Sequence, residues 1–214
     1  MKYSKLFLLY ICLLFSITGF AQKKQLQIVR DQIKAGKELT KAENTLRGLL
    51  ADSTNRKNSK IWLLLCDALT KQYNQGNEKL YLKQKYDTAA FFSLTRKLYE
   101  TMSSFDSLDA KSDADGKVHA KYRTKHATFL NSIRPNLFNG GSYFVHKNDY
   151  KTAFDYYSDY LKSAKYPLFE GYDYMQHDAL IPQAAYWAMF CGYKLLYAEK
   201  NMRIKKQAER NTSM

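Results

Sequence analysis

The chain has 214 residues, 45% of them hydrophobic, and a formal net charge of +14 at pH 7. This length is sufficient for one domain with a sizeable core. The chain contains only 3 prolines and no sustained alternation of apolar and polar residues. These features argue against a sheet protein and predict a nearly all-helical fold.

The first 21 residues are predicted to be a secretory signal peptide. Lys2 and Lys5 precede an almost wholly apolar run over residues 6–20, and Gly19 and Ala21 are the small residues that a signal peptidase reads. A membrane anchor is the alternative, but an apolar run of about 15 residues is short for a span that needs about 20. The segment is typical of exported proteins of Gram-negative bacteria, so we expect a periplasmic location.

The rest of the chain is predicted to form helices separated by polar turns, because apolar residues recur at three- and four-residue spacing. A polar insertion at 74–77 departs from this spacing, and 103–116 is expected to be a surface connection. Pro135 suits the first turn of a helix, where its missing N–H costs nothing. In chain order, the expected helices are 25–35, 40–50, a helix that begins after Ser59 as N-cap, 85–102, 118–133, 136–147, 150–163 and 181–197.

One polar segment superficially matches a calcium-binding loop. Asp113, Asp115 and Gly116 fall at the third, fifth and sixth positions of an EF-hand loop. Lys111 and Tyr122 then occupy the first and last positions, where the loop requires carboxylate ligands. We therefore expect no calcium site here, and no metal or other cofactor elsewhere.

The histidines and cysteines are expected to have structural surroundings. His119 and His126 are separated by about 10 Å along a helix, too far to share one metal ion, and we expect them to be exposed or at the edge of the core. Cys66 and Cys191 each lie in an apolar run, so buried free thiols are favoured. A disulfide is the alternative, because exported proteins can form one.

The clearest pattern is a helical hairpin made of the segments 136–147 and 150–163. Gly141 and Ala153 leave room where two helices approach closely, and the aromatic residues around them fill the remaining space. Each glycine costs a helix about 1 kcal/mol relative to alanine. A close contact between the two helices would account for that cost. Pro167 cannot continue the second helix and marks its end.

This hairpin resembles a tetratricopeptide (TPR) repeat, a helix–turn–helix unit with a period of 34 residues. The resemblance is carried by Gly141, Phe144, Tyr150, Ala153 and Tyr157, which suit the small and aromatic positions of the repeat.

Other parts of the chain resemble the same repeat less closely. In segment 25–50, only the second helix fits the repeat pattern well. In segment 59–102, Trp62 and a small or apolar residue lie at the spacing that the repeat requires. The resemblance implies an all-α fold, an α-α superhelix in which antiparallel helix pairs form a TPR-like solenoid over residues 22–197. Its inner groove would hold a peptide or an extended partner segment.

In the TPR family, particular residues of each first helix line the inner groove. The resemblance therefore implies that a small set of residues contacts the partner, although ordinary exposed residues are the alternative. The set is Asp67, Lys71, Phe138, Ser142 and His146.

The end of the chain interrupts the repeat pattern. The helix expected over 181–197 resembles the first helix of a further repeat, but no second helix of the required pattern follows it. Residues 198–214 are polar and basic and are predicted to form a C-terminal helix or tail. They either cap the solenoid or mark a truncated one, because a solenoid needs its last apolar face covered.

The sequence carries none of the common phosphate-loop, nucleophile-elbow or zinc-protease motifs, so we expect no enzymatic activity. A non-catalytic periplasmic TPR scaffold that binds a protein or peptide segment of the cell envelope is the favoured function. The alternative is a protein that binds acidic glycans or lipid surfaces, suggested by the positive charge and by 18 Tyr and 12 Phe. Nucleic acid is not an expected partner after export. A hydrolase with an unrecognised site is the third hypothesis.

Overall fold

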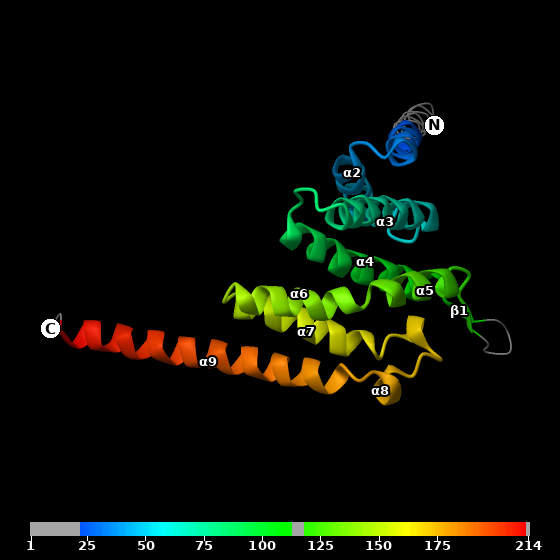
Figure 1. The fold of residues 1–214 in the computed structure, drawn as a ribbon. Helices are drawn as coiled ribbons and strands as arrows, with labels where there is room; N and C mark the ends of the chain where they lie inside the picture. Colours follow the sequence, from blue (N-terminus) through cyan, green and yellow to red (C-terminus); the bar gives the residue numbers. More distant parts are fainter. Residues whose placement is uncertain (1–21, 113–117, 213–214) are drawn as a thin grey trace, which may run out of the picture. The chain divides into compact units, whose positions relative to one another are not determined.

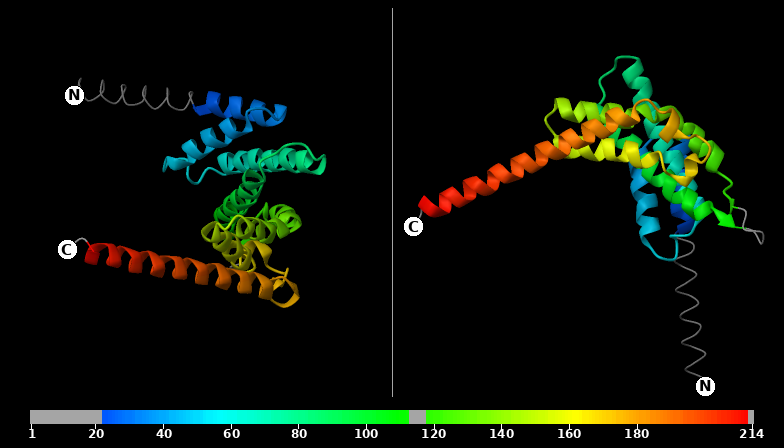
Figure 2. Two further views of the ribbon diagram at one scale, coloured as in Figure 1. Left: turned by 60° about the vertical axis from the view of Figure 1, so that its left-hand side comes forward. Right: turned by 90° about the horizontal axis from the view of Figure 1, so that it is seen from below.

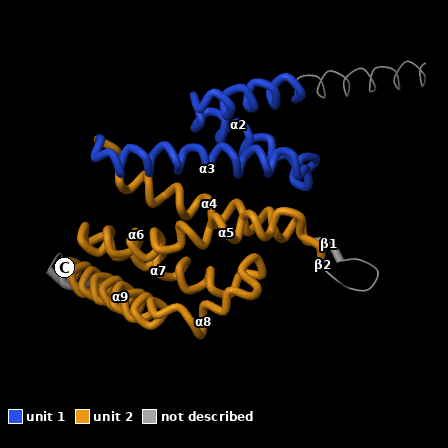
Figure 3. The backbone as a smooth tube through the Cα atoms, turned by 45° about the vertical axis from the view of Figure 1, so that its right-hand side comes forward, with its two compact units in different colours: residues 1–84 blue, residues 85–214 orange. Residues whose placement is uncertain are grey.

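The computed structural model describes residues 22–112 and 118–212, and its regular structure is almost entirely helical (Figure 1). The predicted signal peptide and the centre of the calcium-like loop lie outside the described residues. Two compact units divide the chain, residues 1–84 and 85–214 (Figure 3). None of the described helices has the length and apolar character needed to span a membrane. The prediction of an all-α helical repeat fold is confirmed.

The first unit consists of a helix over residues 22–35, then α2 (Leu39–Ala51) and α3 (Ser59–Tyr81). Gly36 ends the first helix, as predicted, with a positive φ of 67° that favours glycine. The side chain of Gln75 donates to the carbonyl of Gly36 at 2.9 Å. This bond joins the turn to α3.

The third helix corrects two expectations. Its N-cap is Asn58, whose side chain accepts a hydrogen bond from the Lys60 N–H, so Ser59 is the first helical residue and not the cap. The polar residues 74–77 lie inside the helix and do not interrupt it. Gly76 is the buried residue among these four, and its neighbours at 74, 75 and 77 are exposed.

The second unit begins with α4 (Thr88–Asp109) and continues through a two-residue pairing of β1 (Lys111–Ser112) with β2 (Val118–His119). Five helices, one of them short, and one 3-10 turn follow. They are α5 (Arg123–Ile133), α6 (Pro135–His146), α7 (Tyr150–Ser163), the 3-10 turn η1 (Pro167–Phe169), the short helix α8 (Tyr174–His177) and α9 (Ile181–Thr212).

Three helix boundaries in this unit differ from those expected. Residues 103–109 continue α4 because Phe105 is a fully buried apolar anchor and Asp106 is 4% exposed. The helix expected from residue 118 begins only at Arg123, because the preceding residues pair with β1. The last helix does not end at Tyr197 but continues to Thr212, since nothing in the polar sequence breaks a helix.

The predicted hairpin is present as α6 and α7. Pro135 occupies the first turn of α6, and the side chain of Asp149 caps α7 by accepting a hydrogen bond from the Thr152 N–H at 3.0 Å. Helix α7 packs against α6 on one side and α9 on the other. It is therefore the central helix of the second unit.

Two consecutive glycines let α6 approach α7 closely. A Cβ added at Gly140 would lie 2.6 Å from the ring of Tyr156, and one added at Gly141 would lie 2.6 Å from the ring of Tyr157. Both tyrosines are at most 2% exposed, so their rings have no free space to move into. The close contact that the sequence indicated is thus made between backbone and aromatic rings.

The two cysteines of the described chain, Cys66 and Cys191, are free and buried, as favoured. His126 is also buried, with 5% exposure, which corrects the expectation of an exposed or core-edge residue. It lies beside the rings of Phe105 and Tyr122, and its Nδ1 atom has no hydrogen-bond partner among the described residues. Burial is the main cause that lowers the pKa of His126, and the positive charge of Lys125 lowers it further.

We predict that replacing Gly141 with Ala lowers the free energy of unfolding by about 1–3 kcal/mol, the usual cost of overpacking a core. The matched control is Gly192→Ala in α9, where a Cβ would meet Phe154 at an ordinary 3.6 Å. That change should leave stability equal or raise it by up to about 1 kcal/mol through helix propensity. Urea denaturation of both variants checks this, and equal effects would contradict the close contact.

We also predict that His126 contributes to the pH dependence of stability. Because burial lowers the pKa of His126 in the native state, the unfolded state binds the proton more readily, and stability falls as the pH drops below the ordinary histidine pKa of about 6.5. Between about pH 7.5 and pH 5.5, the unfolding free energy of His126→Phe should fall by up to about 1 kcal/mol less than that of the parent. Urea denaturation at both pH values measures the difference, and equal changes in the two proteins would contradict it.

Candidate functional site

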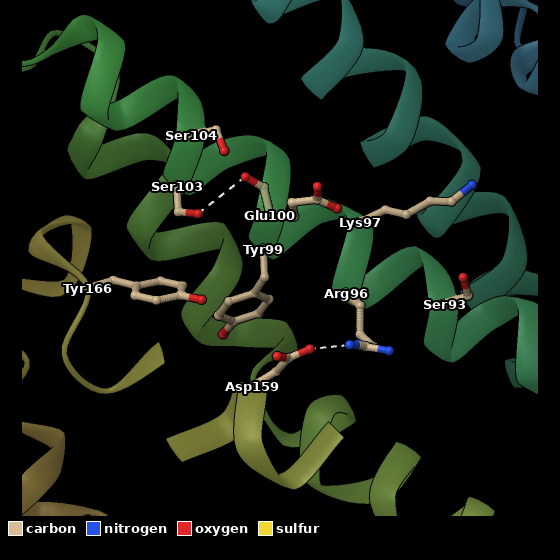
Figure 4. Close-up of a pocket in the computed structure, with 9 residues that line it drawn as sticks. All are labelled: Ser93, Arg96, Lys97, Tyr99, Glu100, Ser103, Ser104, Asp159 and Tyr166. Carbon is tan, nitrogen blue, oxygen red and sulfur yellow. Dashed lines mark hydrogen bonds and ion pairs between the residues drawn. The ribbon is translucent and has the colours of Figure 1, made fainter. Parts of the chain in front are cut away.

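A hollow in the second unit lies between α4, α7 and the segment that follows α7 (Figure 4). Its volume is about 440 Å³. Seven of its residues come from α4 and recur every three or four positions, so they share one helix face. The lining residues are Ser93, Arg96, Lys97, Tyr99, Glu100, Ser103, Ser104, Asp159 and Tyr166.

An ion pair crosses this pocket. The Nε atom of Arg96 donates to Asp159 at 2.6 Å, and both side chains are about one-third exposed, at 35% and 30%. The guanidinium also lies 4.9 Å from the centre of the Tyr156 ring. A pair this exposed adds little to stability. Its effect is to fix a charged donor group at the wall of the pocket.

The tyrosines of the pocket have different roles. Tyr99 is buried and donates its hydroxyl proton to the carbonyl of Leu130 at 2.7 Å. Tyr166 is half-buried, and burial together with the carboxylates of Asp159 and Glu100 raises the pKa of its phenol. Tyr166 therefore stays neutral at physiological pH, so its hydroxyl can both donate and accept.

These groups give the wall of the pocket both hydrogen-bond donors and hydrogen-bond acceptors. Serine and tyrosine hydroxyls can donate or accept, Glu100 accepts, and Arg96 and Lys97 donate. No histidine or cysteine is among the residues that line the pocket. The arrangement can hold a polar chain by hydrogen bonds on both sides.

A second hollow, of about 360 Å³, is lined in part by Arg134, which lies at the junction of α5 and α6. The guanidinium lies between two rings, 3.8 Å from the centre of Tyr160 and 4.0 Å from that of Tyr174. It forms an ion pair with Asp178 and donates to the carbonyl of Tyr160 at 3.1 Å.

The polar groups around Arg134 form hydrogen bonds with one another. The hydroxyl of Tyr160 donates to Asp178 at 2.6 Å. Although burial raises the pKa of Asp178, hydrogen bonds from Tyr160, from the Leu180 N–H and from Arg134 hold it below its usual value. This cluster anchors the connection between α7 and α9 to the α5–α6 junction. Its role is structural, and the pocket of Arg96 is the better candidate for binding.

The five predicted groove residues lie in different surroundings. Phe138 packs edge-on against Tyr157, with ring centres 5.3 Å apart. The Oγ atom of Ser142 is 3.0 Å from the hydroxyl of Tyr157, so both residues face α7. His146 is exposed at the end of α6.

The other two predicted groove residues belong to the first unit. Asp67 is exposed on α3. Lys71 donates its Nζ proton to the carbonyl of Lys34 at 3.1 Å, so it caps the C-terminus of the first helix, residues 22–35. None of the five lines the pocket of Arg96.

The residues singled out for repeat packing make interhelical or capping contacts. Ala153 is fully buried. Phe144 stacks on Tyr156 with ring centres 5.3 Å apart, and Tyr150 meets Phe190 edge-on at 6.1 Å. The indole N–H of Trp62 donates to the carbonyl of Arg56 at 2.9 Å.

Sequence reasoning missed the residues that line the pocket. Arg96 and Asp159 are 63 positions apart in the chain, and each lies on a helix among many other charged residues. The polar residues of α4 do recur at helical spacing over Ser93, Arg96, Glu100 and Ser104. That spacing was the available signal, although it equally describes a solvated helix face.

Among the described residues, no group of three or more His, Cys, Asp or Glu side chains is placed to hold a metal ion. Comparison of the chain with protein-family models, with curated proteins and with solved structures gave no match. The interpretation of the site therefore depends on its own geometry.

We predict that Arg134→Ala lowers the free energy of unfolding by about 3–5 kcal/mol, because removing one partner leaves the other charge of a buried pair uncompensated. The control is Arg203→Ala in α9, whose ion pair with Glu199 is exposed and should contribute little. Thermal and urea unfolding followed by circular dichroism measure both. A loss at Arg134 no larger than that at Arg203 would contradict the anchoring role.

Proposed function

We propose that this protein is a non-catalytic, TPR-like scaffold that is exported to the periplasm and binds an extended segment of a partner protein. The observation that carries the proposal is the pocket of Arg96, where donors and acceptors follow one face of a rigid helix. The hairpin of α6 and α7, with its small residues against aromatic rings, supports the resemblance to a TPR repeat. The apolar segment over residues 6–20 supports export.

The dimensions of the pocket suit an extended polypeptide. Its α4 residues run from Ser93 to Ser104, a rise of about 16 Å along a helix. An extended chain covers that distance in about five residues. Each of those residues brings one N–H donor and one C=O acceptor, which can pair with the donors and acceptors of the pocket wall.

The alternative function, binding of acidic glycans or lipid surfaces, has weaker support. It requires exposed aromatic residues beside a basic face. Most aromatic rings of the described chain pack against other rings or lie in the core, Tyr156, Tyr157 and Phe105 among them, and the exposed tyrosines of α9 lie outside the pocket. The pocket itself contains the carboxylates of Asp159 and Glu100, which would repel an anionic ligand.

We predict that selection of unstructured peptides from a displayed library by the full chain will yield ligands whose binding depends on the pocket. Arg96→Ala and Tyr166→Phe should each weaken the best peptide by about tenfold, because a lost hydrogen bond to a charged or buried group costs about 1.5 kcal/mol or more. Fluorescence polarisation at low and high salt measures the affinity.

Lys151→Ala serves as the control for this experiment. Its ion pair with Asp155 is on the surface of α7, and the pocket does not include it, so peptide affinity should not change. Melting temperatures of the variants identify any loss of folding. Peptides that bind equally well to Arg96→Ala would contradict the proposal. Binding of an anionic glycan at low salt only would favour the alternative.

A further inference from the structure

The last helix carries a row of exposed apolar side chains that do not line the pocket of Arg96. We call this row the α9 stripe, and its members are 55–69% exposed. At 100° per residue they fall within an arc of about 100°, the width of the apolar face by which a helix usually packs in a protein core. The stripe consists of Tyr186, Met189, Tyr193, Leu196, Tyr197 and Ile204.

The α9 stripe lies on the side of the helix that faces away from α7. Ala184, Ala188 and Cys191 form the opposite, buried face, and α9 packs against α7. Helix α7 has a helix on each side, whereas α9 has α7 on one side and exposed apolar residues on the other. Figure 2 shows that the C-terminal half of α9 extends beyond the other helices of its unit. The position next to α9 therefore accommodates another helix.

The charge of α9 indicates which kind of helix would fit. Residues 181–193 of α9 carry no charged side chain. The remaining residues, 194–212, carry six Lys and Arg and two Glu. Lys200 lies within the arc of the stripe, and Arg203 lies about 20° outside one edge of it. A helix that packs along the stripe would bring its flanking residues beside these cations. Acidic flanking residues would complement them.

We propose that the α9 stripe is a docking surface for an acidic amphipathic helix of a partner protein. Tyr and Met, which make up four of the six members, are enriched in the cores of protein interfaces. A membrane surface fits less well, because interfacial helices present Trp, Phe and Leu to the lipid. The Trp of α9, Trp187, is directed to the ring of Tyr157 instead. A second copy is disfavoured because each chain carries a formal charge of +14.

The test uses the full chain and a displayed library of amphipathic helical peptides of about 20 residues. Leucines are fixed on one face, and the remaining positions vary among Glu, Gln and Lys. The proposal expects enrichment of peptides with net negative charge. A paired Lys200→Glu and Arg203→Glu variant should lose this preference or reverse it.

A matched pair of variants identifies the surface that binds. Ile204 and Met202 are both 57% exposed, but Met202 lies on the opposite side of the helix from the stripe. Ile204→Asp and Leu196→Asp should each weaken the best peptide at least tenfold, and Met202→Asp less than twofold. Arg96→Ala should have no effect on these helical peptides, which separates this surface from the pocket of the proposed function.

Several results would overturn the proposal. Enrichment of neutral or basic peptides would remove the role of charge, and equal losses with Ile204→Asp and Met202→Asp would remove the role of the stripe. Binding to phosphatidylglycerol vesicles that is lost in Leu196→Asp would assign the stripe to a membrane surface. Self-association in sedimentation experiments that is lost in the same variant would assign it to a second copy.

Discussion

The second unit depends on the close approach of α6 to α7 at two consecutive glycines. At Gly140 and Gly141 the backbone of α6 lies directly against the rings of Tyr156 and Tyr157. Each ring, held in place by this contact, also positions something else. Tyr156 lies beside the guanidinium of Arg96, and Tyr157 stacks on Trp187 with ring centres 6.4 Å apart. One helix contact thus orients both the pocket wall and the last helix.

A second constraint closes the unit at its other end. Arg134, held between two tyrosine rings and paired with Asp178, is almost completely buried. Such a buried pair stabilises a structure only when all of its donors and acceptors are used, and here the backbone and a tyrosine hydroxyl complete the set. The irregular segment after α7 therefore has a defined path. Tyr166, which lines the pocket, lies at the start of this segment.

Because of these two sets of contacts, α7 is buried between its neighbouring helices, and α9 is covered on one side only. The pocket of Arg96 is lined by hydrogen-bond donors and acceptors, so it suits a polar ligand. The α9 stripe is apolar with the cations Lys200 and Arg203 within and beside it, so it suits a ligand that also buries hydrophobic area. The two surfaces differ in chemistry and would recognise different segments of a partner.

The sequence by itself determined the helical class and the hairpin of α6 and α7, and it favoured free thiols at Cys66 and Cys191. Local physics controls these features: spacing sets the amphipathic face, Pro135 favours a first turn, and Gly36 allows the left-handed conformation that ends a helix. The hairpin was also visible because its small and aromatic residues lie within one short segment, so that Gly141 and Tyr157 could be paired from spacing alone.

Only the tertiary structure decided where the longer helices end and where a binding site lies. Phe105 continues α4 through a polar segment because burial of its ring outweighs the weak local preference for a turn. Arg96 meets Asp159, and Arg134 meets Asp178, across separations of 63 and 44 residues. A charged residue on a helix has no local feature that identifies its partner. The packing of α7 between its neighbours selects these partners, and it also decides that one face of α9 stays exposed.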